Sequence, residues 1–409
     1  MNRNLSQRYN ISLADDPKTM KRIELALKRS KELDQTAMME LSAKEFNYET
    51  CKDEMWNPER FSLLYKTWIW EQSTPEQKIK LNQLFWVAYY SQIISAEIAT
   101  LFYNQTSAAA LYGIEDFKVV CDTLDLESAQ ERAHIHAFKM IGEKFEQENF
   151  GERVFTYPMR TPFEKTMLYS DLGKIKQWLR KCQLQAFTMI SANSPFIGCQ
   201  YFTVRGLRTL NGKIVQHQLS RYYNEHEDKY NSPIPSKVSY YHFIDESFHF
   251  NTSTVVGHDV INSLPKPSKL EMLIGNMAIR GCQMDHYNFS TAINGIFWYD
   301  PALYPNIYKI LRSKIFSMDH NEALEAMRKS FCEESEGMMA SYKTHRESVD
   351  SYKAYLQDFQ YITKENKELA FMASNNLEKH LQQLKPSSCE IYPCMVFYSR
   401  GRQSCNFWT

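Results

Sequence analysis

Apolar side chains recur at helical spacing along most of this chain. Over the first eighty residues, charged and apolar positions alternate at intervals of three and four, as in the run 16–41. This pattern predicts amphipathic helices that form an outer supporting layer. Further along, four segments are apolar enough to be buried on most of their faces. They cover residues 80–105, 124–147, 175–210 and 236–260.

Helix-breaking residues mark where these segments begin and end. Gly151 follows the second segment, Asn-Ser-Pro at 193–195 interrupts the third, and Ser236 comes after two prolines, which predicts that it caps the fourth. The polar stretch 211–236 contains Asn-Gly and those two prolines, so we expect a long loop between the third and fourth helices. Four buried helices inside a helical shell are typical of a bundle.

The C-terminal part shows the same helical spacing without a recognisable motif. Helices are expected at 269–287, 321–348 and 350–383. The whole chain is therefore interpreted as one all-α domain in four parts. These are N-terminal supporting helices at 1–79, the four-helix core at 80–260, further helices at 261–385 and an extended tail at 386–409.

Composition narrows the class of protein. The chain has 409 residues, with only 13 glycines and 14 prolines, and so few backbone breakers argue against a turn-rich sandwich or barrel. Its 48 basic and 48 acidic side chains give no net charge, which argues against a nucleic-acid partner. Nine cysteines, odd in number and scattered, together with a polar start, indicate reduced thiols in a cytoplasmic protein.

Glu97 is the most informative residue of the first apolar segment. The run 84–103 is long and apolar enough to imitate a membrane span, but a carboxylate near its middle is costly in lipid. We therefore expect a buried core helix and no membrane partner. A carboxylate among apolar neighbours must be paired, protonated or bound to a metal, unless it lies at a helix edge that touches solvent.

Two other buried segments carry histidines and glutamates at helical spacing. Glu131 and His134 form a Glu-x-x-His pair, whose members share one face of a helix. His242, Glu246 and His249 stand at i, i+4 and i+7, within about 60° of arc, so all three project together.

Carboxylates and histidines on facing helices predict a centre for two metal ions. Dimetal bundles use Glu-x-x-His from two helices and further glutamates from the others. Carboxylate and neutral imidazole ligands favour iron or manganese. The alternative interpretation is a set of core histidines whose hydrogen bonds are satisfied within the protein.

The motif His242-x-x-Asp245-Glu246-x-x-His249, with Glu97 and the Glu131 motif, resembles the p-aminobenzoate N-oxygenase family of ferritin-like di-iron enzymes. The resemblance covers about 80–260. It implies a ferritin-like four-helix bundle with the dimetal site in its core.

The resemblance also implies how the ligands divide between the metals. Glu131 and Glu246 would bridge them, Glu97 and His134 would complete one metal, and His242 and His249 would complete the other. Asp245 would accept the free N–H of a ligand histidine, His134 in the first instance, and Gln130 would serve His249 in the same way.

One departure from this family stands out. The family has a glutamate on the third helix, but no Glu occurs between Glu164 and Glu225. Replacing a carboxylate by a small residue opens a metal position to a halide, and in this respect the chain resembles the dimetal-carboxylate halogenases of the cylindrocyclophane type. The residues expected to line the open position are Thr188, Ser191, Ala192 and Gln200.

This second resemblance implies an O2-activating oxidase that chlorinates an unactivated C–H bond of a fatty acyl chain on an acyl carrier protein. The implied cofactors are two iron ions, with manganese an option at one site, and O2 and halide are the co-substrates. A homodimer is a further expectation. The alternatives are an N-oxygenase or hydroxylase with the same di-iron site, and a non-catalytic ferritin-like metal-binding protein.

Overall fold

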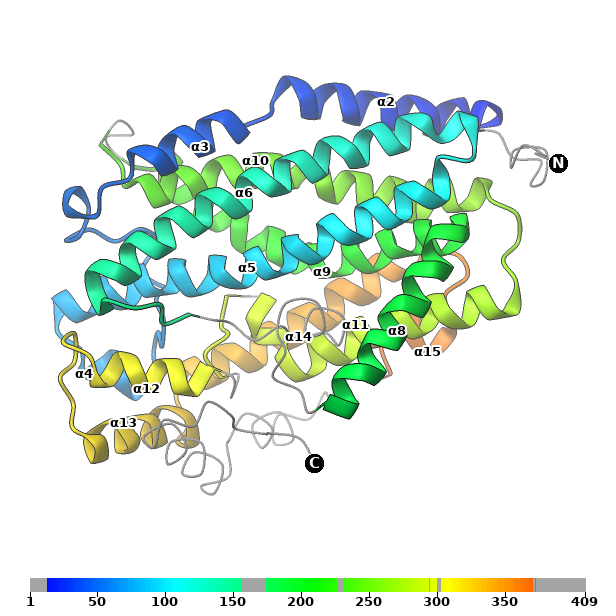
Figure 1. Cartoon of the computed structure of the whole chain (residues 1–409). Coiled ribbons are helices and arrows are strands. Elements are labelled where there is room, and N and C mark those ends of the chain that lie inside the picture. The colour runs from blue at the N-terminus through cyan, green and yellow to red at the C-terminus, as the bar shows by residue number, and fades with distance from the viewer. Residues whose placement is uncertain are drawn as a thin grey trace.

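The computed structural model of the protein describes residues 13–155, 174–226, 231–293, 295–299, 303–370 and 372. Every regular element in these residues is a helix and none is a strand, which confirms the expected all-α class (Figure 1). The expected tail at 386–409 lies outside the described residues.

Four long helices form the central bundle. They are α5 (Pro75–Leu111), α6 (Lys118–Phe150), α9 (Pro195–Asn224) and α10 (Ile234–Thr254). α5 packs along α6, α9 packs along α10, and α5 also contacts α9 (Figure 1). The four apolar segments of the sequence each lie mainly in one of these helices or, for the third, in α8 (Lys174–Asn193) and α9.

Local sequence signals explain where these helices begin and end. Thr74 and Gln77 form a reciprocal capping box at the start of α5, which leaves fewer backbone N–H groups unpaired. The Ser194 hydroxyl accepts the N–H of Ile197 at the start of α9, as the expected interruption of the third segment requires. Gly151 ends α6 with a positive φ of 69°, a conformation that glycine adopts without strain.

The prediction of a loop at 211–236 is wrong for most of that range. α9 continues through Asn-Gly as far as Asn224, so this helix is much longer than the apolar pattern suggested. A glycine inside a helix costs about 1 kcal/mol, which the packing of α9 against α5 and α10 outweighs. The expected cap is also wrong: α10 is capped at Pro233, and the Ser236 hydroxyl donates instead to the carbonyl of Trp56, at 2.7 Å.

Two N-terminal helices cover the outside of the bundle, as the amphipathic pattern predicted. α2 (Pro17–Glu32) and α3 (Thr36–Glu45) lie along α6 and α10 (Figure 1). Only their inner faces are buried, for example at Ile23 and Met39.

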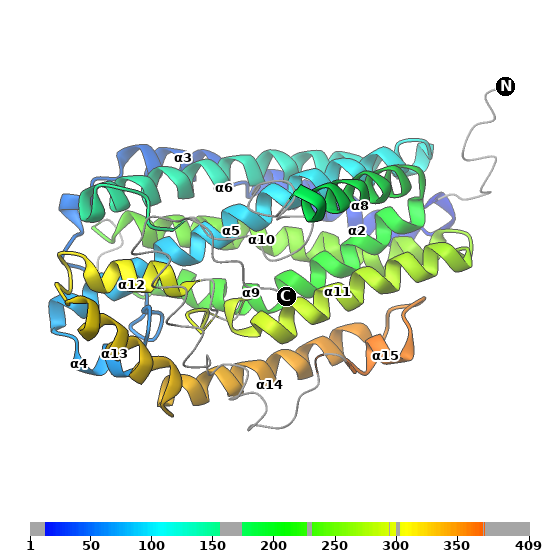
Figure 2. The same cartoon turned by 60° about the horizontal axis from the view of Figure 1, so that its bottom comes forward.

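The C-terminal helices pack mainly against the opposite side (Figure 2). They are α11 (Lys269–Ile293), α12 (Tyr304–Arg312), α13 (His320–Cys332), α14 (Glu336–Leu356) and α15 (Lys364–Lys367). α11 and α14 contact α9, and Tyr355 of α14 fills the space beside Gly206 where a Cβ would stand.

The expected boundaries in this part need correction. The predicted helix 321–348 is two helices, because the Ser335 side chain caps a new helix start. The described part of the predicted helix 350–383 is the end of α14, which stops at Leu356, followed by the short α15, while residues 373–383 lie outside the described residues.

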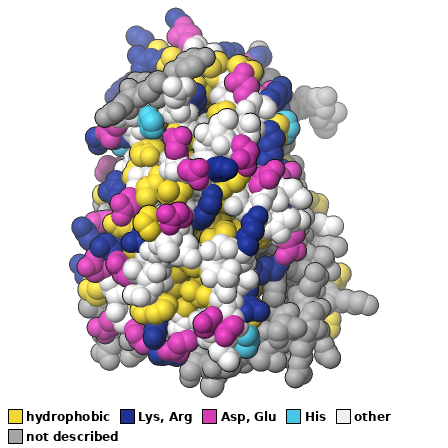
Figure 3. Space-filling view, turned by 90° about the vertical axis from the view of Figure 1, so that its left-hand side faces the viewer, with side chains coloured by type: hydrophobic (Ala, Val, Ile, Leu, Met, Phe, Trp, Pro, Cys, Tyr) yellow, Lys and Arg dark blue, Asp and Glu magenta, His cyan; other side chains and the backbone are white. Residues whose placement is uncertain are grey.

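The surface carries both signs of charge. Figure 3 shows acidic and basic side chains interspersed over one end of the molecule, as the balanced composition leads one to expect. Within the described residues, no helix combines the length and the apolar character needed to span a bilayer.

Candidate dimetal centre

Six side chains from three bundle helices converge in the core. Glu97 comes from α5, the Glu131 and His134 pair from α6, and a further three from α10, which are His242, Glu246 and His249. Each of the six residues is at most 8% exposed. The structure therefore brings together all the ligand residues predicted from the sequence.

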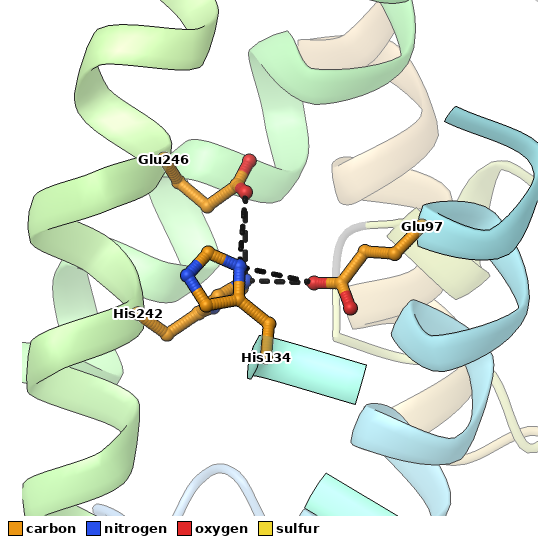
Figure 4. Close-up of side chains that lie close together, drawn as sticks. All are labelled: Glu97, His134, His242 and Glu246. Atoms are coloured by element: carbon orange, nitrogen blue, oxygen red, sulfur yellow. Dashed lines mark hydrogen bonds and ion pairs between the residues drawn. The ribbon is translucent and has the colours of Figure 1, made fainter. Parts of the chain in front are cut away.

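The first group holds four of these residues around one point (Figure 4). His242 Nε2 lies 3.1 Å from Glu97 Oε1, and His134 Nδ1 lies 3.7 Å from the same oxygen. Glu246 Oε1 completes the group, 3.9 Å from His134 Nδ1. The four ligand atoms all lie within 4.8 Å of one another, a spacing that suits a single cation.

The second group consists of Glu131, Glu246 and His249. His249 Nδ1 lies 2.8 Å from Glu246 Oε1 and 3.4 Å from Glu131 Oε1. Glu246 thus belongs to both groups, while the second oxygen of Glu131 lies 3.7 Å from His134 Nδ1. Both carboxylates stand between the two metal positions, where bridging ligands are needed.

His242 differs from what the resemblance implied. It was expected to share a metal with His249, but the structure groups it with Glu97 and His134. Seven residues of helix separate His242 from His249, a rise of about 10 Å, so the two rings reach different heights of the bundle. The group around His249 consequently has the fewer protein ligands.

The donor atoms fit metal ions. Among the described residues, three buried atoms of the cluster's ligand groups have no hydrogen-bond partner. They are Glu97 Oε2, Glu131 Oε2 and His134 Nδ1. A buried polar atom without a partner costs about 1–3 kcal/mol, and a bound cation removes that cost for carboxylate oxygens and imidazole nitrogens. Oxygen and nitrogen donors of this kind suit iron or manganese.

Crowding of buried ionisable groups shifts the pKa values of the cluster. Burial raises the pKa of Glu97 well above its usual value, although the nearby His134 ring acts to lower it. For Glu131, the charge of His249 and the closeness of both histidine rings outweigh burial and lower the pKa to about 2. Burial lowers the pKa of His242 to about 3.

Nearby carboxylates have the opposite effect on the other two histidines. The hydrogen bond to Asp245 and the nearby carboxylates of Glu131 and Glu97 outweigh burial and raise the pKa of His134 well above its usual value. The charges of Glu246 and other glutamates do the same for the pKa of His249. The carboxylates of the cluster therefore favour positive charge on His134 and His249.

Polar side chains contact two of the histidine rings on the side that faces away from the cluster. His134 Nε2 lies 3.1 Å from Asp245 Oδ2, and the other oxygen of Asp245 accepts the backbone N–H of Gln35. His249 Nε2 lies 3.0 Å from Gln130 Oε1. When Nε2 carries the proton, Nδ1 of each ring presents its lone pair to the cluster.

A buried cation next to the cluster was missed by the sequence analysis. Arg205 of α9 lies 2.7 Å from Glu127 of α6 and also contacts Asn104 of α5. On α10, its guanidinium donates to the backbone carbonyl of His249 and to the Ser253 hydroxyl. Arg205 therefore links all four bundle helices by hydrogen bonds, and one of these bonds is to the backbone of the ligand residue His249. An arginine and a glutamate inside otherwise apolar helices were the available signal.

The residues expected to line an open metal position lie elsewhere. Thr188, Ser191 and Ala192 stand on α8, outside the four-helix core. Gln200 is on α9, but a Cβ on Gly275 of α11 would stand 2.9 Å from its Cγ, so this side chain faces α11. The misplacement follows from the underestimated length of α9.

Contacts along α9 identify the part that faces the cluster. Arg205 hydrogen-bonds Asn104 of α5, and the side chain of Gln216 lies near the hydroxyl of Tyr89, also on α5. Glu97 lies between those two α5 residues. The buried α9 residue on the same face, two helical turns beyond Arg205, is Gly212. We infer that Gly212 occupies the third-helix position where the resemblance implied a glutamate.

The fold and the cluster define a class of protein. A four-helix bundle whose core gathers carboxylates and histidines into two adjoining groups has the architecture of the dimetal-carboxylate proteins. Residues 18–388 match a family model described as acyl halogenase CylC-like. The chain belongs to this CylC-like acyl halogenase family, and it is therefore an enzyme with an acyl substrate. No curated protein and no solved structure matches it.

Proposed function

We propose that the protein chlorinates an unactivated C–H bond of a fatty acyl chain, using two iron ions, O2 and chloride. The family supplies the reaction class, acyl halogenation. The observation that supports the finer proposal is a buried glycine, Gly212, on the α9 face where we infer that the glutamate implied by the resemblance would stand. A glycine leaves room for an exogenous ligand where a glutamate would otherwise bind.

The chain contributes positioning and exclusion of water. Asp245 and Gln130 orient the rings of His134 and His249 toward the cluster. Bound iron would supply the activation of O2 and would hold the halide. The overall reaction takes the C–H compound, chloride, O2, two electrons and three protons to the C–Cl compound and two waters. The two electrons come from an external reductant.

Aromatic side chains surround the site on one side. Tyr90 and Phe138 both pack edge-to-face on the His242 ring, with centroids 5.7 and 5.0 Å away. Apolar walls of this kind exclude water and suit an aliphatic chain. We propose that the acyl chain arrives on an acyl carrier protein, as the resemblance to the cylindrocyclophane-type halogenases implied.

The test combines metal loading with product analysis. Protein loaded with Fe(II) under anaerobic conditions receives chloride and a medium-chain acyl carrier thioester and is then exposed to O2. A product with the isotope pair of one chlorine supports the proposal, and bromide in place of chloride should give the brominated product. A product that has gained oxygen without halogen would instead identify a hydroxylase with the same site. Manganese loading in parallel determines whether it replaces one iron.

A further inference from the structure

A continuous row of aromatic rings leads from the metal cluster to the protein surface. The ring of His242 lies 5.7 Å from that of Tyr90, and Tyr90 lies 4.5 Å from Trp86, centroid to centroid. Trp86 then lies 6.0 Å from Trp56, which lies 6.2 Å from Tyr48. Three of these four contacts are edge-to-face and the Tyr90–Trp86 contact is tilted, with centroid distances in the range that aromatic pairs favour.

Burial and polarity change along this row. Tyr90, Trp86 and Trp56 are each at most 1% exposed, whereas Tyr48 at 8% contacts the partly exposed Lys80 ammonium group. The Tyr48 hydroxyl also lies 3.1 Å from Gln83 Oε1 and 3.2 Å from Asn149 Oδ1. The row therefore begins at the buried cluster and ends at a tyrosine hydroxyl that contacts a partly exposed lysine.

Backbone carbonyls hold the two indoles in a state suited to electron loss. Trp86 Nε1–H donates to the carbonyl of Pro235 and to the Ser239 hydroxyl, each at 3.0 Å. Trp56 Nε1–H donates to the carbonyl of Cys51 at 3.2 Å. A carbonyl oxygen stabilises a positive indole without taking its proton, because amide carbonyls are very weak bases.

We propose that this row, which we name the aromatic relay (Tyr90, Trp86, Trp56 and Tyr48), supplies electrons to the metal site when no acyl chain is bound. These electrons reduce the oxidised site without oxidising the acyl substrate. Trp86 gives one electron, through the Tyr90 ring, to the metal pair that O2 has oxidised, and Trp56 refills Trp86. Tyr48 refills Trp56, loses its phenolic proton to water near Lys80 and becomes a neutral phenoxyl radical. An external thiol returns a hydrogen atom to Tyr48, and two passages convert two thiols into one disulfide.

The relay rests on the proposed function only for its iron and O2. The test maps oxidised residues by peptide mass spectrometry after Fe(II)-loaded protein meets O2 without acyl substrate and without thiol. Stable oxidation products are expected at Trp56 and Tyr48. In Trp86→Phe, oxidation at these two residues should fall severalfold while oxidation near Tyr90 rises.

A second variant that breaks the relay, and a matched control variant outside it, make the result specific. Trp56→Phe should lower oxidation at Tyr48 and raise it at Trp86. Trp70→Phe removes another buried tryptophan, outside the relay, and should leave the pattern unchanged. Equal oxidation of Tyr48 in wild type and in both relay variants, or none there while O2 is consumed, would overturn the relay. Normal relay oxidation in a protein that forms no chlorinated product would instead contradict the proposed function alone.

Discussion

The Asp245 carboxylate lies 3.1 Å from His134 Nε2, on the side of the ring that faces away from the metal cluster. This pair decides which nitrogen of His134 carries the proton. Asp245 also accepts the backbone N–H of Gln35, just before α3, so an outer helix helps to fix its position. The Asp245 carboxylate thus connects the outer helical layer to the ligand histidine His134 by hydrogen bonds.

Replacing Asp245 by asparagine should weaken metal binding. The amide of Asn can donate to Nε2, which favours the wrong tautomer and takes the Nδ1 lone pair away from the metal. Loss of such a supporting partner typically lowers metal affinity about 10–100-fold. Titration of the apoprotein with Fe(II) under anaerobic conditions measures this. The effect should be confined to one of the two bound ions, and an unchanged affinity for both would show that Asp245 does not set the tautomer.

A glutamate at Gly212 should change the product. In Gly212→Glu the third-helix carboxylate is restored, so it competes with chloride for the metal near His249. Chlorination should be lost while two metal ions remain bound, and any remaining product should contain oxygen in place of chlorine. Mass spectrometry of the acyl product provides the measurement. Ile214→Glu is the control, because that side chain is 51% exposed on the same helix. Full chlorination by Gly212→Glu would place the open position elsewhere.

Removing Arg205 should destabilise the bundle strongly. In Arg205→Met, Glu127 becomes an unpaired buried charge, and breaking a buried pair from one side costs about 3–5 kcal/mol. Chemical denaturation of the metal-free protein measures the loss. The double variant Arg205→Met with Glu127→Gln should recover part of that stability, because no unpaired charge remains. A single variant as stable as the wild type would mean that this pair contributes little.

Metal binding should stabilise the fold and depend on Glu246. Ligands that bind only the native state raise the free energy of unfolding, and metal sites couple strongly to folding. Fe(II) or Mn(II) should therefore raise the Tm of the wild-type protein. Glu246 belongs to both ligand groups, so Glu246→Gln should lower the shift more than Glu97→Gln, which affects one group. Equal shifts in the two variants would argue against a shared ligand.

Much of the site could be predicted because its residues stand out against their surroundings. Glu97 is a carboxylate in an apolar helix, and the spacings of His242, Glu246 and His249 place them on one face whatever the rest of the fold does. Helix ends at Gly151 and Ser194 were also readable, since their signals are local.

The errors came from features that depend on tertiary packing. Asn-Gly at 211–212 normally indicates a turn, but contacts with α5 and α10 keep it helical. Because α9 was expected to end early, the third-helix position was expected at Ser191, which the structure places on α8, or at Gln200, near the start of α9. The Arg205 network joins residues from four helices, and no periodicity within one helix reveals such a group.

The most direct test of the account is to locate the halide itself. Crystals of Fe(II)-loaded protein grown with bromide allow anomalous scattering to identify both iron and bromine. The account predicts two iron ions among the six ligand residues and one bromide on the ion held by Glu131, Glu246 and His249, on the side that faces Gly212. Two irons with a protein side chain in that position and no bromide would contradict it.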